Sequence, residues 1–193
     1  MRGHGSSGGV QTSGGYFEQN DVLGAFDFLV QQGIPSESIG VIGFSMGAGT
    51  TILSATQEPA IRALVADSSY ARVSDLLANE TARKTKLPKW LSPIFIPGVK
   101  IMARLFYDID IGALVPEEAV KLLPYPIFII HGTSDTRIPY DHSQRILREA
   151  HPDSIIWLVP GVDHADAFLT YPKEYVERVE NYFNAQLGAV CSD

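Results

Sequence analysis

The chain has 193 residues, of which 45% are hydrophobic and 19% are charged, a composition typical of a globular domain with one hydrophobic core. Its 15 basic and 22 acidic residues give a formal net charge of −7, which argues against the basic surface that nucleic-acid-binding proteins need. No uninterrupted apolar stretch reaches about 18 residues, the length of a membrane-spanning helix, so we expect a soluble protein. The single cysteine, Cys191, excludes an intrachain disulfide and a zinc site built on cysteines.

The first nine residues are rich in glycine and serine and predict a loop. They lack the basic start and the apolar run of about 7–15 residues that a secretory signal needs, so a cytoplasmic location is favoured. Residues 16–32 predict an amphipathic helix, because apolar side chains such as Val22, Phe26 and Leu29 recur on one face and Gly33 follows as a stop signal.

Residues 38–44 are almost continuously apolar, which predicts a strand buried on both faces of a parallel sheet. A helix rich in small residues follows over 45–53. Further strands are predicted over 61–66, 126–131 and 155–159, and further helices over about 141–150 and 172–187. This alternation of strands and helices predicts an α/β fold with a mainly parallel sheet and helices on both faces.

One connection, residues 68–125, is far longer than the usual few residues between elements. It contains predicted helices over 72–86, 99–107 and 117–123, with a proline-rich segment over 87–98. We interpret it as a helical cap inserted over the sheet of a single domain that spans residues 1–193.

Gly43-Phe44-Ser45-Met46-Gly47 fits the motif G-x-S-x-G and lies between a predicted strand and a predicted helix. This context is typical of a nucleophile elbow, in which a strained turn projects the serine Oγ from the carboxyl edge of the sheet. Glycines on both sides would allow the two backbones to approach closely. The alternative is a packing turn without a chemical role.

A serine hydroxyl becomes a nucleophile when a base takes its proton and a carboxylate orients that base. Asp135 follows the predicted strand 126–131, and His164 follows the predicted strand 155–159. Because the carboxyl ends of parallel strands lie at one edge of the sheet, we expect Ser45, Asp135 and His164 to converge there.

Other side chains compete for these roles. Asp67 also follows a predicted strand and remains a rival to Asp135 as the acid, whereas Asp163 is expected to shape the loop that carries His164. The other histidines are expected in the opening loop (His4), at a strand end where it packs or hydrogen-bonds locally (His131), and on or beside a surface helix (His142, His151). Metal binding by His164 with Asp163 or Asp166 is a weaker alternative, because no ligand spacing such as H-E-x-x-H occurs.

Residues 3–8 fit G-x-G-x-x-G, the pattern of dinucleotide-binding turns. Such a turn needs a strand before it and an acid at a strand end about 20 residues later. No predicted strand precedes these residues, and Asp27 falls in the middle of a predicted helix. We therefore interpret the segment as a glycine-rich turn that binds no nucleotide.

Four segments, residues 2–9, 42–47, 131–139 and 160–165, resemble successive landmarks of the α/β-hydrolase superfamily. The resemblance extends from residue 1 to about residue 187 and is closest to bacterial serine hydrolases of the esterase and serine-aminopeptidase-like type. It implies an α/β-hydrolase fold, with Ser45 as nucleophile, Asp135 as acid and His164 as base, and no cofactor. It also implies that the backbone N–H of Met46 is one donor of the oxyanion hole.

In that superfamily, the loop that resembles residues 2–9 follows the fourth strand, and a second oxyanion donor follows the third. The resemblance therefore implies that this chain retains strands five to eight and is a truncated reading of a longer protein. Loss of one oxyanion donor alone lowers rates about 10²–10³-fold, and an unpaired sheet edge favours aggregation. We accordingly expect the chain by itself to be a poor catalyst and prone to aggregate.

The predicted cap carries an unusual charge pattern, because residues 81–106 contain six basic residues and no acidic one, interleaved with apolar side chains. Two interpretations remain open. The apolar residues pack on the sheet beneath a solvated basic face, or the segment contacts an anionic membrane surface or an acyl chain.

These features together predict a cofactor-independent serine hydrolase that cleaves a carboxylic ester through an acyl-enzyme. Serine peptidase and thioesterase activities share the same triad chemistry. The alternative from a different class is a non-catalytic binding or interaction module that keeps the triad residues.

Overall fold

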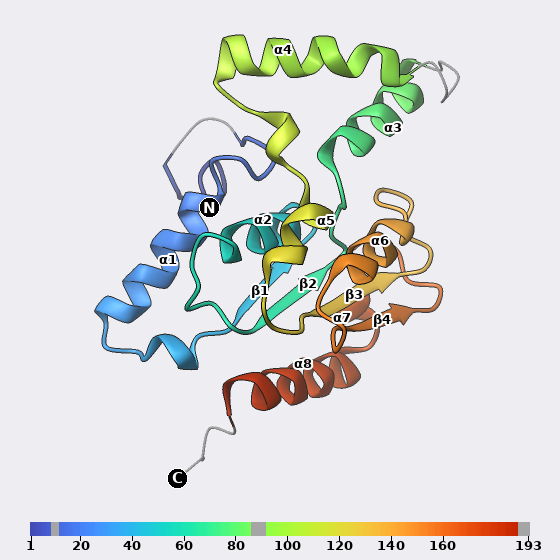
Figure 1. Cartoon of the computed structure of the whole chain (residues 1–193). Helices are drawn as coiled ribbons and strands as arrows, with labels where there is room; N and C mark the ends of the chain where they lie inside the picture. Colours follow the sequence, from blue (N-terminus) through green and yellow to red (C-terminus); the bar gives the residue numbers. More distant parts are fainter. Residues whose placement is uncertain (9–11, 86–91, 189–193) are drawn as a thin grey trace.

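The computed structural model describes residues 1–8, 12–85 and 92–188, and Cys191 lies outside them. A parallel sheet of four strands in the order β1-β2-β3-β4 forms the centre of the molecule (Figure 1). The strands are β1 (Val41–Phe44), β2 (Leu64–Asp67), β3 (Phe128–Gly132) and β4 (Ile155–Val159). They fall on the four predicted strand segments and confirm the α/β fold class.

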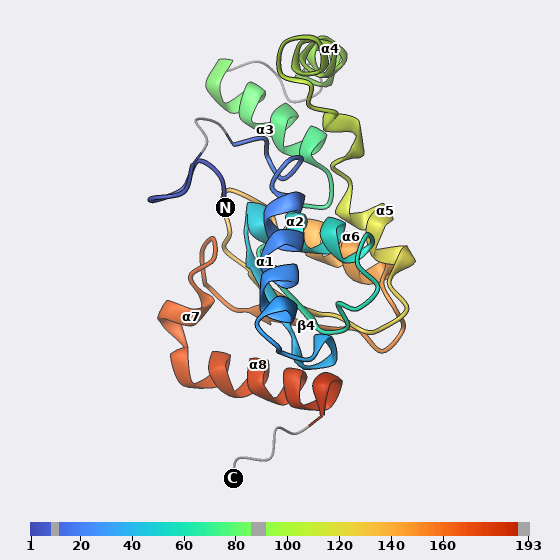
Figure 2. The ribbon, with the colours of Figure 1, turned by 90° about the vertical axis from the view of Figure 1, so that its left-hand side faces the viewer.

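Helices cover both faces of the sheet (Figures 1 and 2). One face packs against α1 (Gln19–Gln31), α2 (Met46–Ala55) and α6 (Asp141–Glu149), and the other against α8 (Pro172–Leu187). Two short elements lie in connections: η1 (Ser36–Ser38) between α1 and β1, and α7 (Ala167–Thr170) between β4 and α8. Each predicted helix outside the insertion is present, with α1 beginning three residues later than expected.

The central strand β3 shows why its sequence is almost continuously apolar. Ile127 and Ile129 belong to the hydrophobic cluster on the α1–α2–α6 face, whereas Phe128 and Ile130 belong to the cluster on the α8 face. All four side chains are buried. A strand covered by helices on both faces has no solvent-facing side, so no polar alternation is needed.

The expectation that β1 is buried on both faces is wrong. Ile42 and Phe44 are 38% and 44% exposed, because β1 is an edge strand of this sheet. These two side chains lie on the α8 face, where Phe44 stacks on Tyr175 at a ring-centroid distance of 6.5 Å. Hydropathy therefore identified the strand, but its burial depends on which elements lie beside it.

The insertion over residues 68–125 divides into two parts. Helices α3 (Val73–Thr85) and α4 (Ile96–Tyr107), joined through η2 (Ser92–Phe95), project away from the sheet in both views. After η3 (Ile111–Ala113), the chain returns through α5 (Pro116–Ala119) and η4 (Val120–Leu122), where Val120 joins the core of the α1–α2–α6 face. The end of the predicted cap is therefore part of the core layer.

An ionic cluster anchors the base of this insertion to the main domain. Arg145 of α6 bonds Asp75 of α3 at 2.7 Å and Glu117 of α5 at 2.7 Å. Arg72 contacts Glu117 and Glu118 as well. Because Glu117 is buried, these charge-assisted hydrogen bonds satisfy its carboxylate and fix where the insertion leaves and rejoins the domain.

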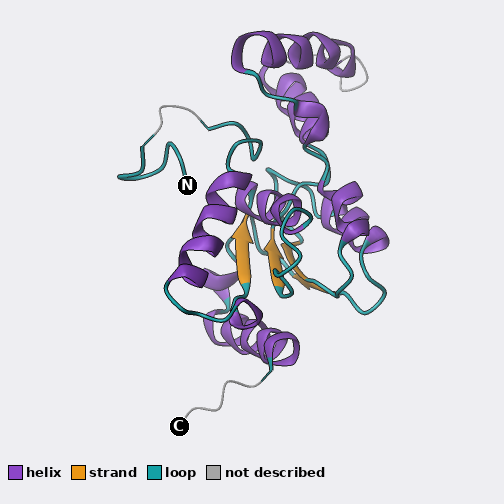
Figure 3. Ribbon diagram, turned by 60° about the vertical axis from the view of Figure 1, so that its left-hand side comes forward, coloured by secondary structure: helices purple, strands orange, loops and turns teal. Residues whose placement is uncertain are grey.

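The strands run toward the end of the molecule that carries α3 and α4, as the arrowheads in Figure 3 show. Their carboxyl ends therefore open beneath the cap. Within the described residues, no helix is long and apolar enough to cross a membrane.

Candidate active site

Ser45 occupies the turn between β1, which ends at Phe44, and α2, which begins at Met46. Its φ of 53° and ψ of −117° lie in a region that non-glycine residues rarely adopt. The Ser45 N–H donates a hydrogen bond of 2.8 Å to the carbonyl of Asp67 on β2. The neighbouring strand thus holds the strained turn in place.

The two glycines of the motif play different parts. A Cβ at Gly43 would lie 2.4 Å from the carbonyl oxygen of Gly47, so only glycine lets the first turn of α2 pack against β1. A Cβ at Gly47 would meet nothing nearer than 3.9 Å. The expectation that both glycines are needed for close approach therefore holds at Gly43 and is wrong at Gly47.

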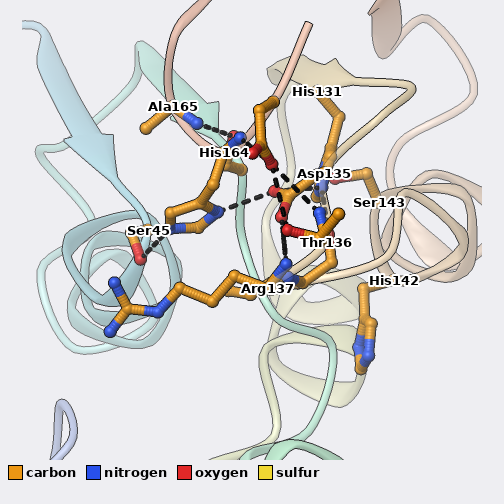
Figure 4. A network of polar contacts seen from close by, with 12 residues as sticks. Ser45, His131, Asp135, Thr136, Arg137, His142, Ser143, His164 and Ala165 are labelled. Carbon is orange, nitrogen blue, oxygen red and sulfur yellow. Dashed lines mark hydrogen bonds and ion pairs between the residues drawn. The ribbon is translucent and has the colours of Figure 1, made fainter. Parts of the chain in front are cut away.

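The structure brings Ser45, His164 and Asp135 together in one chain of hydrogen bonds (Figure 4). His164 Nε2 lies 2.7 Å from Ser45 Oγ, and His164 Nδ1 lies 2.7 Å from Asp135 Oδ2. Asp135 follows β3 and His164 follows β4. The three residues are far apart in sequence and meet because their strands end at the same edge of the sheet.

The carboxylate of Asp135 is buried and fully supplied with donors. Its Oδ1 accepts hydrogen bonds from the N–H groups of Arg137 (2.9 Å) and Ile138 (2.8 Å). Its Oδ2 lies 3.1 Å from His131 Nε2 in addition to His164. Burial alone would raise the pKa of Asp135, but the hydrogen bonds from the two imidazoles and from Ile138 hold it well below the usual range.

Two histidines depart from the sequence-based expectation. His131 is buried and bonds locally as predicted, at 2.5 Å to Ser143 Oγ and 2.8 Å to the carbonyl of Ile138, but it also contacts the acid. His142 was expected on a surface and is buried instead, where its Nδ1 accepts a hydrogen bond from the N–H of Ala71. Burial lowers the pKa of His142.

Asp67, the rival acid, lies at the end of β2 but does not contact His164. Its carboxylate is buried and bonds Ser68 Oγ at 2.9 Å and the Tyr175 hydroxyl at 3.0 Å. Ser68 Oγ in turn accepts a hydrogen bond of 3.1 Å from the N–H of Ala165, next to His164. Asp67 therefore acts on the histidine loop through Ser68, a contact that no sequence pattern predicted.

Asp163 joins the loops of the acid and the histidine. Its Oδ1 accepts hydrogen bonds from the N–H of Thr136 at 3.0 Å and from the N–H of His164 at 2.8 Å. This placement agrees with the expected loop-shaping role. In the described part of the chain, no group of three or more histidine, cysteine or acidic side chains is arranged to hold a metal ion.

Two cavities meet at Ser45. One, of about 610 Å³, lies between the sheet edge and α3 and is lined mainly by apolar groups, including Val73, Leu76 and Leu77. The other, of about 840 Å³, runs along β1 and α1. Arg137 lines both cavities and points toward Ser45 in Figure 4.

Comparison with known proteins fits this geometry. The chain superposes on an esterase of Pyrococcus furiosus, Pf2001, with a TM-score of 0.73 and 26% identity, covering 97% of this chain and 69% of the esterase. The α/β hydrolase GrgF from Penicillium sp. sh18 matches with a TM-score of 0.70 and 13% identity, over 97% of this chain and 78% of GrgF. The chain belongs to the α/β-hydrolase superfamily.

Sequence relatives and a family profile extend the comparison for this α/β hydrolase. The uncharacterized protein YqkD of Bacillus subtilis (strain 168) is 25% identical over 185 residues, which cover 95% of this chain and 60% of YqkD. YfhR of Salmonella typhi is 26% identical over 202 aligned residues, covering 97% of this chain and 61% of YfhR. The chain therefore spans about 60% of these relatives. The profile of the X-Pro dipeptidyl-peptidase (S15) family matches residues 1–95.

Substitutions at the two motif glycines test the elbow packing of this α/β hydrolase. Gly43→Ala should lower the free energy of unfolding by at least about 2 kcal/mol, because its Cβ meets backbone atoms that cannot move aside. Gly47→Ala is the matched control and should change it by less than about 1 kcal/mol. Urea unfolding measures both variants, and an equal effect of the two would contradict the packing argument.

The depressed pKa of Asp135 predicts a pH-dependent stability. A carboxylate whose pKa is lowered on folding stabilises the folded state above its unfolded pKa of about 3.9, and this contribution is lost as the pH falls below that value. Between about pH 5 and about pH 3, wild type should lose about 1 kcal/mol more unfolding free energy than Asp135→Asn. Urea titrations at the two pH values measure the difference, and equal losses would show that Asp135 is not held ionised by folding.

Proposed function

We propose that this α/β hydrolase is a serine hydrolase that cleaves a carboxylic ester through an acyl-enzyme, with Ser45 as nucleophile, His164 as base and Asp135 as acid. The observation that carries the proposal is the continuous chain of two 2.7 Å hydrogen bonds from Ser45 through His164 to Asp135. The buried carboxylate at its end favours the His164 tautomer with a proton on Nδ1 and leaves Nε2 to accept the serine proton.

In this mechanism, Ser45 Oγ attacks the ester carbonyl carbon while His164 Nε2 takes the hydroxyl proton. The carbonyl π electrons move to oxygen, and the N–H of Met46, the first residue of α2, donates to that oxyanion. The tetrahedral intermediate collapses, the alcohol leaves with the proton from His164, and an acyl-Ser45 remains. Water activated by His164 then attacks the acyl group, releasing the carboxylic acid and restoring Ser45.

The cavity beside α3 supports an apolar acyl or alcohol group on the substrate. Tyr70, Val73, Leu76, Leu77 and Ile138 line it next to Ser45. A largely apolar wall with few polar groups is typical of small-molecule sites. The proposed substrate is therefore an ester whose acyl or alcohol part is apolar enough to fill this space.

A peptidase is the second candidate, since the X-Pro dipeptidyl-peptidase profile matches residues 1–95. An enzyme that releases dipeptides has to bind the charged amino terminus of its substrate, which needs acceptor groups near the nucleophile. In the described part of the chain, the one charged side chain lining the 610 Å³ cavity is the cation Arg137. In the larger cavity, Asp21 is already paired with Arg2 at 2.8 Å. This charge distribution favours the ester.

Covalent labelling distinguishes a hydrolase from a non-catalytic binding module. A fluorophosphonate should label the purified chain, because the hydrogen-bonded His164 raises the reactivity of Ser45. Labelling should fall to background in Ser45→Ala and persist in Ser38→Ala, an exposed serine outside the site. A folded wild-type chain that, even after prolonged exposure to the probe, takes up no more label than Ser45→Ala would favour the binding module.

Paired substrates distinguish the esterase from the peptidase. Cleavage of an aryl butyrate should exceed cleavage of an X-Pro aryl amide with a free amino terminus by about two orders of magnitude in kcat/KM, because among the described residues lining the two cavities the one carboxylate, Asp21, is already paired with Arg2. Release of the chromogenic alcohol or amine measures both reactions. Faster release from the X-Pro amide would identify a peptidase instead.

A further inference from the structure

Helix α4 presents its apolar side chains to solvent. Val99, Met102 and Phe106 follow one another at helical spacing, and Ile101 and Leu105 continue the same face. All five are exposed, with Leu105 at 73% and Phe106 at 66%. Ile94 and Phe95 of η2, just before the helix, are exposed as well. We call these seven residues the α4 stripe.

The opposite side of α4 faces the protein. Ile96 is buried, and Lys100 and Ala103, four and seven residues further on, are half-buried. In an ordinary surface helix, the apolar stripe faces the core and the polar side faces water. In α4 most of the apolar side chains face solvent instead, so burial within this chain does not account for its apolar face.

The exposure of α4 bears on the two interpretations of residues 81–106 that the sequence left open. One interpretation placed the apolar residues of the 81–106 segment against the sheet, beneath a basic solvated face. The described residues of the α4 stripe do not pack on the sheet, since the main contacts of α4 are with α3, η2 and η3. Figures 1 and 2 both show α4 at the outermost end of the molecule.

The charges around the stripe indicate what it contacts. Arg104, whose side chain is 58% exposed, lies on the helix beside the stripe, and residues 81–106 carry six basic residues without an acidic one. Acidic groups appear just beyond the helix, where Asp108 and Asp110 lie 4.0 Å and 3.7 Å from Arg104. These contacts are long and exposed, so they neutralise Arg104 only weakly.

We propose that α4 docks on an anionic lipid surface, with the α4 stripe entering the acyl boundary and the neighbouring basic side chains contacting the headgroups. An apolar face joined to lysine and arginine on one short helix is the pattern of helices that lie in the membrane interface. The carboxyl edge of the sheet opens toward α3 and α4 (Figure 3), so docking would turn the Ser45 cavities toward the lipid. The proposal does not depend on the reaction that Ser45 performs.

Vesicle pelleting of the full chain tests this docking. Wild type should pellet with vesicles of phosphatidylcholine mixed with phosphatidylglycerol, and less with phosphatidylcholine alone or at raised salt. The double variant Leu105→Ser/Phe106→Ser should lower the partition coefficient about tenfold or more, because two exposed apolar anchors are lost. Arg104→Glu is a second, independent variant and should weaken pelleting with the anionic vesicles, because it reverses the charge of an exposed basic side chain of α4.

The matched control is Leu122→Ser/Phe28→Ser, which replaces the same two residue types at positions 72% and 58% exposed on η4 and α1. It should pellet like wild type. Wild type that stays in the supernatant, a folded Leu105→Ser/Phe106→Ser variant that pellets as well as wild type, or equal binding to both vesicle types would overturn the proposal. A wild-type dimer that binds no vesicles and becomes monomeric in Leu105→Ser/Phe106→Ser would assign the stripe to a second copy of the chain instead.

Discussion

The buried carboxylate of Asp135 is the interaction on which the site depends. A buried charge is costly unless donors surround it, and this one is surrounded by two backbone N–H groups and the imidazoles of His131 and His164. These donors come from β3, from the turn after β3 and from the loop after β4. Folding of the sheet edge therefore satisfies the carboxylate and orients His164 toward Ser45 in the same step.

Backbone strain concentrates at the same edge. Ser45, Ser68 and Ala165 have positive φ values of 53°, 56° and 57°, although none is glycine. The hydrogen bond from the N–H of Ala165 to Ser68 Oγ joins two of them, and the buried Asp67 carboxylate holds Ser68. Such conformations persist only where the surroundings fix them and are typical of functional sites. The Asp67–Ser68 pair thus positions the loop of His164.

Local sequence patterns predicted the strands and the helices. They also predicted that Ser45, Asp135 and His164 converge, because each residue follows a predicted strand and parallel strands end at the same edge of a sheet. The burial of His142 was missed, although Ile146, four residues later on the same face of α6, is buried as well. The contacts of His131 with Asp135 and of Ser68 with Ala165 join side chains from turns whose geometry no periodicity specifies. The exposure of β1 could not be read from its own hydropathy, because it depends on strand order, although the resemblance to α/β hydrolases did imply an unpaired sheet edge.

The two helices α8 and α4 show what hydrophobic periodicity determines. In α8, Tyr175 and Tyr182 recur seven residues apart and both pack into the sheet. In α4, Val99 and Phe106 have the same spacing but face solvent. The periodicity of a sequence determines that a helix has an apolar face, whereas the packing of the helix determines whether that face points to the core or to solvent. Because α3 carries α4 away from the sheet, the apolar face of α4 is free to meet a surface outside the chain.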